Sequence, residues 1–237
     1  MRKIATATIL GIALIYGCIQ GSMWQYDRYQ VRHANNELIK DNTKKPSLTE
    51  AQLLDLGKNE AAWRLVDLDG SFLPDKELLL RNRYHDGKYG FGVVTLFKSD
   101  SGILYWVDRG WVIAGATAQT PPVTQKVTTE RTSITARVRV EDIENQIKGS
   151  VFAAPGVASN QLQKWNSQEQ VSTSNVYLDL LSSDIKEFIP KVPAMLPEIS
   201  DGPHLAYSFQ WLIFALLVVL AWFLVVREER RAQTAKL

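Results

Sequence analysis

Two long runs of uncharged residues, one near each end of the chain, constrain this protein more than any other feature. Every residue from Ile4 to Tyr26 is uncharged, and so is every residue from Leu205 to Val226. Roughly 20 apolar residues in a helix are enough to cross a hydrocarbon core about 30 Å thick. The sequence therefore predicts transmembrane helices at residues 4–26 and 205–226, with residues 27–204 outside the membrane between them.

The first run also has features of a cleaved signal peptide. Arg2 and Lys3 precede an apolar core, and Ile15-Tyr16-Gly17-Cys18 imitates a lipoprotein cleavage box. However, Tyr16 is bulky where such boxes carry a small or branched residue, and the apolar run continues beyond Cys18. A retained helix is therefore favoured over cleavage or lipidation.

The charges on the two short tails predict the orientation. Residues 1–3 and 227–237 hold six of the 27 basic residues and two of the 25 acidic residues. Basic tails favour the cytoplasmic side, so we expect a multi-pass protein with both tails in the cytoplasm and residues 27–204 on the outer face. The first span begins almost at the first residue, without an Arg- and Ser-rich presequence, which favours a bacterial cytoplasmic membrane over an organelle.

The middle of the chain lacks the excess positive charge of nucleic-acid-binding proteins and the cysteines of disulfide-bonded proteins. Without the tails, acidic residues slightly outnumber basic ones, so nucleic-acid binding is not expected. Cys18 is the only cysteine and lies in the first apolar run. The outer domain therefore has no disulfide, and its core must be stable without one.

The segment after the first span is helical in character. Asp27 to Lys45 is rich in charged and polar residues and is followed by Pro46, a natural stop, so the first helix is expected to continue beyond the membrane. A short second helix is predicted from Thr49 to Asn59, because Thr49 and Gln52 have the spacing of a capping box.

From Trp63 onward the pattern becomes that of β-strands. In the clearest segment, Ile134, Ala136, Val138 and Val140 face one way while Arg137 and Arg139 face the other. Alternation or a high content of β-branched and aromatic residues predicts the other strands, which are residues 65–70, 91–97, 103–112 and 175–181.

Turn-forming residue pairs separate these predicted strands. They are Pro74-Asp75, Asp86-Gly87, Ser101-Gly102 and Pro121-Pro122, at spacings typical of antiparallel hairpins. The predicted fold class is an α+β membrane protein, in which N- and C-terminal transmembrane helices flank an antiparallel β-rich extracytoplasmic domain.

Four patches stand out along the chain, and two of them lie at the predicted membrane boundaries. The patches are Gly21-Ser22-Met23-Trp24-Gln25-Tyr26-Asp27-Arg28, Gly70-Ser71-Phe72 with Leu79-Leu80-Arg81-Asn82-Arg83, Val107-Asp108-Arg109-Gly110-Trp111-Val112, and Gly202-Pro203-His204-Leu205-Ala206-Tyr207-Ser208-Phe209-Gln210-Trp211. Taken in order, they resemble the surfeit locus protein 1 family of cytochrome c oxidase assembly factors, and the resemblance covers nearly the whole chain. The chain departs from the family pattern at Asp108, where many relatives carry Asn.

The resemblance implies a role in assembling haem-copper oxidases of the respiratory chain. For bacterial members it also implies binding of haem a and its delivery to the oxidase. The expected partners are the catalytic subunit of cytochrome c oxidase, the machinery that makes haem a, and the lipid bilayer.

The residues at the start of the second span form a candidate cofactor site. His204, Tyr207, Ser208 and Trp211 recur at helical spacing on one face, and Gln210 lies somewhat to the side. A neutral imidazole at the end of a membrane helix can hold iron, so His204 is the candidate metal ligand. The alternative is an interfacial belt of aromatic residues with polar tips.

The first span ends in a matching cluster. Trp24, Arg28 and Arg32 share one face, with Gln25 beside them. Guanidinium groups pair well with carboxylates, so Arg28, with Arg32 as a second candidate, is predicted to receive the propionates of a haem, while Trp24 and Trp211 wall its macrocycle. The alternative is binding of these arginines to lipid phosphates.

Close packing of the two spans is suggested by Gly17-x-x-x-Gly21, a spacing that lets helix backbones approach. In the middle domain, Arg109 is expected to stack on Trp106 or Trp111, or to pair with Asp108 or another carboxylate, and a structural role is favoured over ligand contact.

The other histidines and the enzyme motifs give no further site. His33 and His85 are expected to be solvated surface residues. The sequence has no C-x-x-C-H, H-E-x-x-H or G-x-S-x-G motif, and the glycines Gly87, Gly90 and Gly92 lead into a strand instead of a phosphate-binding helix. We therefore expect a protein that is not an enzyme.

Three functions follow from the sequence, in order of preference. The first is an assembly factor that binds haem a at the outer membrane interface and delivers it to the catalytic subunit of the oxidase. The second is a scaffold or accessory subunit that stabilises oxidase subunits without touching haem. The third is a membrane-anchored enzyme with an unrecognised site.

Overall fold

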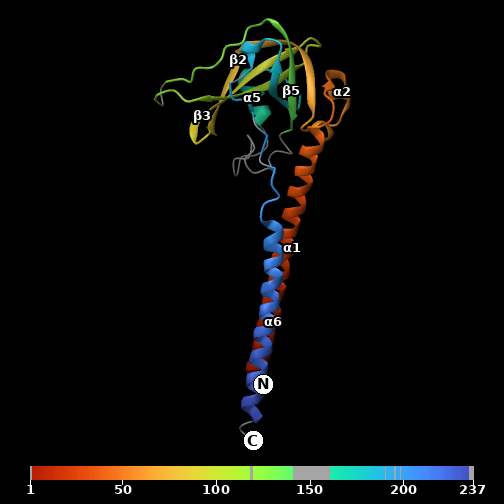
Figure 1. Cartoon of the computed structure of the whole chain (residues 1–237), viewed down its shortest axis with the longest axis vertical. Helices are drawn as coiled ribbons and strands as arrows, with labels where there is room; N and C mark the ends of the chain where they lie inside the picture. Colours follow the sequence, from red (N-terminus) through yellow and green to blue (C-terminus); the bar gives the residue numbers. More distant parts are fainter. Residues whose placement is uncertain are drawn as a thin grey trace. The chain divides into compact units, whose positions relative to one another are not determined.

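The computed structural model of the chain describes residues 2–117, 120–140, 161–189, 191–194, 196–197 and 199–234 (Figure 1). The chain divides into two compact units. Met1–Asn36 and Ser200–Leu237 form the first unit, and Glu37–Ile199 forms the second.

The first unit is built from two long helices, α1 (Arg2–Asn42) and α6 (His204–Thr234). The last turns of α1, from Glu37 onward, belong to the second unit. Both helices are long and apolar enough to cross a membrane. As predicted, α1 continues well past Tyr26, and it ends at Asn42, shortly before Pro46.

The two helices lie side by side and antiparallel (Figure 1). Thr8, near the start of α1, contacts Trp222 in the second half of α6. Gln25, farther along α1, contacts His204 at the start of α6, so the two helices run in opposite directions. Small residues are buried in this interface and let the backbones approach closely. They are Gly11, Cys18 and Ser22 on α1 and Ser208 on α6.

Of the two glycines predicted to pack the spans together, only Gly21 does so. A Cβ atom added at Gly21 would lie 2.8 Å from Cδ2 of Trp211, whereas one added at Gly17 would meet no atom within 4 Å. Gly21 therefore provides the space that the Trp211 ring occupies.

After the end of α1, the second unit contains two short helices, α2 (Glu50–Asp55) and α3 (Lys58–Ala61). The predicted capping box is confirmed: the Thr49 side chain accepts from the Gln52 N–H at 3.3 Å, and Oε1 of Gln52 accepts from the Thr49 N–H at 2.9 Å. The single helix expected over Thr49–Asn59 is interrupted at Leu56, whose backbone is extended.

A closed barrel of five strands, β2-β3-β4-β6-β5, forms the body of this unit, because β5 pairs back onto β2. β5 returns beside β2 after the β2-β3-β4 meander, as in a Greek key. A sixth strand, β1, extends the sheet beside β2. The strands are β1 (Leu48–Thr49), β2 (Leu65–His85), β3 (Lys88–Ser99), β4 (Leu104–Ile113), β5 (Arg131–Arg139) and β6 (Tyr177–Ser183).

The expectation of a purely antiparallel sheet is wrong, since β4 pairs with β6 in parallel and β1 pairs with β2 in parallel. Strand number explains the β4–β6 pair. Strand direction cannot alternate all the way around a closed ring of five strands, so one neighbouring pair must run in parallel.

A second correction concerns Pro74-Asp75, which was expected to separate two strands. β2 instead runs continuously from Leu65 to His85, and the only effect at this point is a shift in register with β3 between Leu73 and Glu77. Proline lacks an N–H to donate, and an irregularity in the ladder is where a strand tolerates it. The long strand pairs with β5 through Leu65–Ser71 and with β3 through Gly70–His85.

The core has two parts. The larger one gathers buried residues from every strand of the barrel, such as Phe72, Phe97, Val107, Ile134 and Leu178. The smaller one lies under helix α5 (Gln161–Glu169), where the rings of Trp106 and Trp165 meet edge to face with centroids 6.0 Å apart. Strands β3 and β4 are therefore buried on both faces along much of their length.

Candidate functional site

The predicted site residues His204 and Gln25 meet across the helix pair. Nδ1 of the His204 imidazole lies 2.9 Å from the amide oxygen Oε1 of Gln25. An amide oxygen can only accept a hydrogen bond, so Nδ1 carries the proton and donates it. In the neutral imidazole, the other ring nitrogen, Nε2, then keeps its lone pair, which is the form that ligates metals.

One turn along the pair, two serines hold the helices in register. The hydroxyls of Ser22 and Ser208 are 3.0 Å apart, and the Ser208 hydroxyl also donates to the backbone carbonyl of Ser22 at 3.1 Å. Because Ser208 uses its proton on the carbonyl, the Ser22 hydroxyl donates to Ser208. Both serines are buried, so this contact supports the adjacent Gln25–His204 pair.

Four predicted site residues converge on one flank of the pair. Gly21, Trp24 and Arg28 share one face of α1, and Tyr207 and Trp211 share one face of α6. The contact of Gly21 with the Trp211 ring joins these faces. The Arg28 guanidinium lies over the Trp24 ring, 5.8 Å from its centroid.

This flank is open. Trp24 is 55% exposed and Tyr207 is 47% exposed, whereas Trp211 is half-buried against Gly21. Gln210 is exposed on α6, to one side of the face that Tyr207 and Trp211 share. Cationic, aromatic and imidazole groups are therefore available on one side of the pair to a flat, partly anionic ligand.

Arg32 packs against Gly202, two residues before His204. Gly202 has a φ of +65°, and a Cβ added to it would lie 2.5 Å from Nη1 of Arg32 and 3.6 Å from Cδ2 of His204. A side chain at Gly202 is thus disfavoured both by the backbone and by the arginine packed against it.

His33 is half-exposed, as predicted, but it is not free in solvent. Its Nδ1 lies 2.9 Å from Asp201, which also accepts from the Asn36 side chain at 2.7 Å. These contacts tie α1 to the segment that leads into α6.

In the barrel, the expectation of a solvated His85 is wrong. Its ring packs beside Trp111, with centroids 5.3 Å apart, and only 24% of the side chain is exposed.

Arg109 makes one of the contacts that the sequence predicted, an ion pair with a carboxylate other than Asp108. It pairs with Glu77 at 3.1 Å, donates to Thr95 and to the backbone carbonyl of Gln125, and lies over Phe72, 5.8 Å from the ring centroid. Arg109 therefore reaches the barrel core, and its cation–π contact is with Phe72 instead of Trp106 or Trp111.

A buried charge network was not anticipated. Asp179 is fully buried on β6 and accepts from Arg137 at 2.6 Å and from Arg139 at 2.5 Å. Asp108 lies opposite Asp179 in the parallel β4–β6 pair, and burial together with the Asp179 charge raises the pKa of Asp108 to about 7. In the sequence, the only sign of this network is the alternation of Arg137 and Arg139 on β5. No pattern close to these arginines indicates that β6 places an aspartate beside them.

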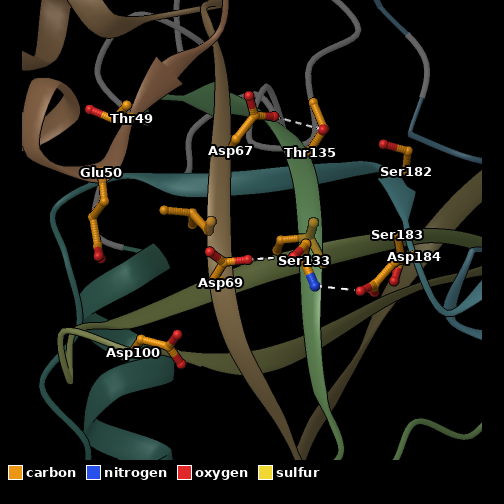
Figure 2. A pocket seen from close by; sticks show the side chains of 12 residues that line it. Thr49, Glu50, Asp67, Asp69, Asp100, Ser133, Thr135, Ser182, Ser183 and Asp184 are labelled. Atoms are coloured by element: carbon orange, nitrogen blue, oxygen red, sulfur yellow. Dashed lines mark hydrogen bonds between the residues drawn. The ribbon is translucent and has the colours of Figure 1, made fainter.

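A groove of about 690 Å³ lies over β2, β5 and β6 and is rich in carboxylates and hydroxyls (Figure 2). Its carboxylates are engaged: Asp67 accepts from Thr135 at 2.7 Å, Asp69 accepts from Ser133, and Asp184 accepts from the Ser133 N–H at 3.1 Å. Over the ranges that the structure describes, no group of three or more His, Cys, Asp and Glu side chains could hold a metal ion.

Comparison with known proteins agrees with the motifs. Residues 12–216 match the SURF1 family. The chain is 28% identical over 232 residues to an uncharacterised SURF1-like protein of Mycobacterium tuberculosis, covering 94% of this chain and 83% of the relative. It is 26% identical over 209 residues to a SURF1-like protein of Rickettsia bellii, covering 83% and 81%. The chain therefore belongs to the SURF1 family, the surfeit locus protein 1 family of oxidase assembly factors.

Proposed function

We propose that this protein assembles a haem-copper oxidase by binding haem a on the α1–α6 pair and delivering it to the catalytic subunit. The observation that supports this most is the hydrogen bond from Nδ1 of His204 to Gln25. It fixes the imidazole in the tautomer whose Nε2 is free to ligate, and such support is typical of metal-ligating histidines.

The residues present fit the group. His204 would hold the iron, Arg28 would pair with a propionate, and Trp24, Tyr207 and Trp211 would offer apolar surface to the macrocycle. When bound, haem a supplies the redox-active iron of the oxidase. The chain's own contribution is to set the tautomer of His204, to neutralise an anionic group with Arg28, and to keep Trp24 accessible on an open flank.

The proposal includes the location given by the charge pattern. With the basic tails of both helices in the cytoplasm of a bacterium, the Gln25–His204 pair lies at the outer boundary of the membrane. There it would receive haem a from the machinery that makes it.

The test is the pigment that the full-length protein carries when purified from cells that make haem a. The wild-type protein should show a haem a absorbance spectrum, and His204→Ala should lose most of it. His33→Ala is the matched control, since His33 is a second histidine on the helix pair but lies on the opposite side of α1 from Trp24. A colourless wild-type protein would overturn haem binding, and pigment that is unchanged in His204→Ala would overturn the assignment of His204 as the iron ligand.

A second candidate is a scaffold that stabilises oxidase subunits without binding haem. The carboxylate-rich groove of Figure 2 favours it, because a negatively charged surface selects a positively charged partner. Oxidase subunits that co-purify equally with wild type and His204→Ala, but not with Asp67→Asn/Asp69→Asn, would support this function instead.

A further inference from the structure

The barrel holds a second cavity, of about 470 Å³, beside the end of strand β4. Its walls are largely apolar, and pockets of this size and character commonly bind small molecules. The apolar residues are Val93, Trp111, Val112, Ile113, Val123 and Val192.

Two cationic side chains, Arg109 and Lys191, also line the cavity, whereas none of its described lining residues is a carboxylate. Glu77 balances the charge of Arg109 but is not part of the lining. The positive charge that Lys191 contributes at the cavity thus has no counterpart in the lining.

Arg109 also has an unused donor. The side chain is only 3% exposed, and its two terminal nitrogens are committed to Glu77, Thr95 and Gln125. Within the described part of the chain, its buried Nε has no hydrogen-bond acceptor. A buried N–H without an acceptor is costly, so Arg109 holds its positive charge beside the cavity at some cost to stability.

From the apolar walls and the two cations, we propose that this cavity binds a monoanionic amphiphile, namely a fatty acid. The acyl chain lies along the valines and Trp111, and the carboxylate pairs with Lys191 on the side of the cavity that Arg109 also lines. This site lies wholly in the second unit and does not depend on haem binding by the helix pair.

The experiment uses the full chain in lipid nanodiscs and a palmitic acid that carries a photoreactive diazirine in its chain. After irradiation, mass spectrometry of peptides compares labelling of the barrel with labelling of α1 and α6, which the membrane-dissolved probe also reaches. We expect labelled barrel peptides that contain Ile113 or Val192, and about tenfold less barrel labelling with the corresponding diazirine alcohol, which lacks the charge.

Val123 offers a variant that leaves the fold intact, because this lining residue is 92% exposed. Val123→Glu places a carboxylate in the cavity and should reduce barrel labelling by the acid about tenfold, whereas the uncharged Val123→Gln should not. Lys191→Gln should weaken labelling severalfold. Labelling confined to the helices, equal labelling by acid and alcohol, or equal labelling of the two Val123 variants would each overturn the proposal.

Discussion

Nδ1 of His204 lies 2.9 Å from Oε1 of Gln25, and this contact joins the two ends of the chain at one point. The two residues belong to different sequence patches, separated by the whole barrel. Their pairing makes the imidazole a candidate ligand with a defined tautomer, and it places the candidate site on the helix pair.

Gln25→Leu should lower haem loading by roughly ten- to a hundredfold, the usual effect of removing a residue that orients a metal ligand. Without the amide oxygen, His204 is free to adopt the other tautomer and to rotate. The measurement is haem absorbance per mole of purified protein. Gln30→Leu, an exposed glutamine on the same helix, is the control and should load normally; equal loading of the two variants would contradict this role for Gln25.

Gly21→Leu should separate the two helices, because even a Cβ at this position would lie 2.8 Å from the Trp211 ring. The measurement is disulfide formation between Ser22→Cys and Ser208→Cys in a Cys18→Ala background, since the two hydroxyls are 3.0 Å apart in the native pair. We expect severalfold less cross-linking with Gly21→Leu. Gly17→Leu should cross-link normally, because a Cβ there meets nothing within 4 Å; a similar loss in both variants would argue against specific packing at Gly21.

Arg137→Met should destabilise the barrel by about 3 kcal/mol, since it removes one of two partners from the buried carboxylate of Asp179. Arg131→Met is the comparison. Arg131 pairs with Asp100, but its side chain is 62% exposed, and such surface pairs contribute little to stability. Urea unfolding of the full chain, followed by tryptophan fluorescence, measures the loss of stability in each variant. An equal loss in the two variants would show that the buried Arg137–Asp179 pair stabilises the barrel no more than a surface pair does.

Asp108→Asn should make the barrel more stable at pH 8 than the wild type. Burial and the charge of Asp179 raise the pKa of Asp108 to about 7, above the value near 4 of an unfolded aspartate. The folded state therefore holds this proton more tightly, and the wild type loses stability as the pH rises from about 4 to 7. The variant cannot ionise and should gain roughly 1–4 kcal/mol on the wild type over this range.

The measurement for Asp108→Asn is the difference in urea-unfolding free energy between variant and wild type at pH 5 and pH 8. The difference should grow toward pH 8. Asp75→Asn, at an exposed position of β2, is the control and should show little change between the two pH values. A constant difference for Asp108→Asn would mean that Asp108 does not ionise within the folded barrel in this range.

Much of the local structure could be predicted from the chain alone. Hydropathy was sufficient to find α1 and α6, the spacing of Thr49 and Gln52 predicted the capping box, and alternation predicted β5. These features arise from residues close together in sequence, so their physical cause can be read locally. The weakly patterned helix α5 was not foreseen, because only Leu162 and Trp165 of its nine residues are buried.

The sequence by itself determined which two segments are long and apolar enough to cross a membrane, where most of the strands lie, and which side chains were candidates for chemistry. Only the tertiary structure decided that five strands close into a ring with a parallel β4–β6 pair, that Asp179 meets Arg137, and that Gln25 meets His204. Strand register and helix pairing depend on the packing of segments far apart in the chain. No local pattern encodes that packing, and it emerges only when the whole core is buried at once.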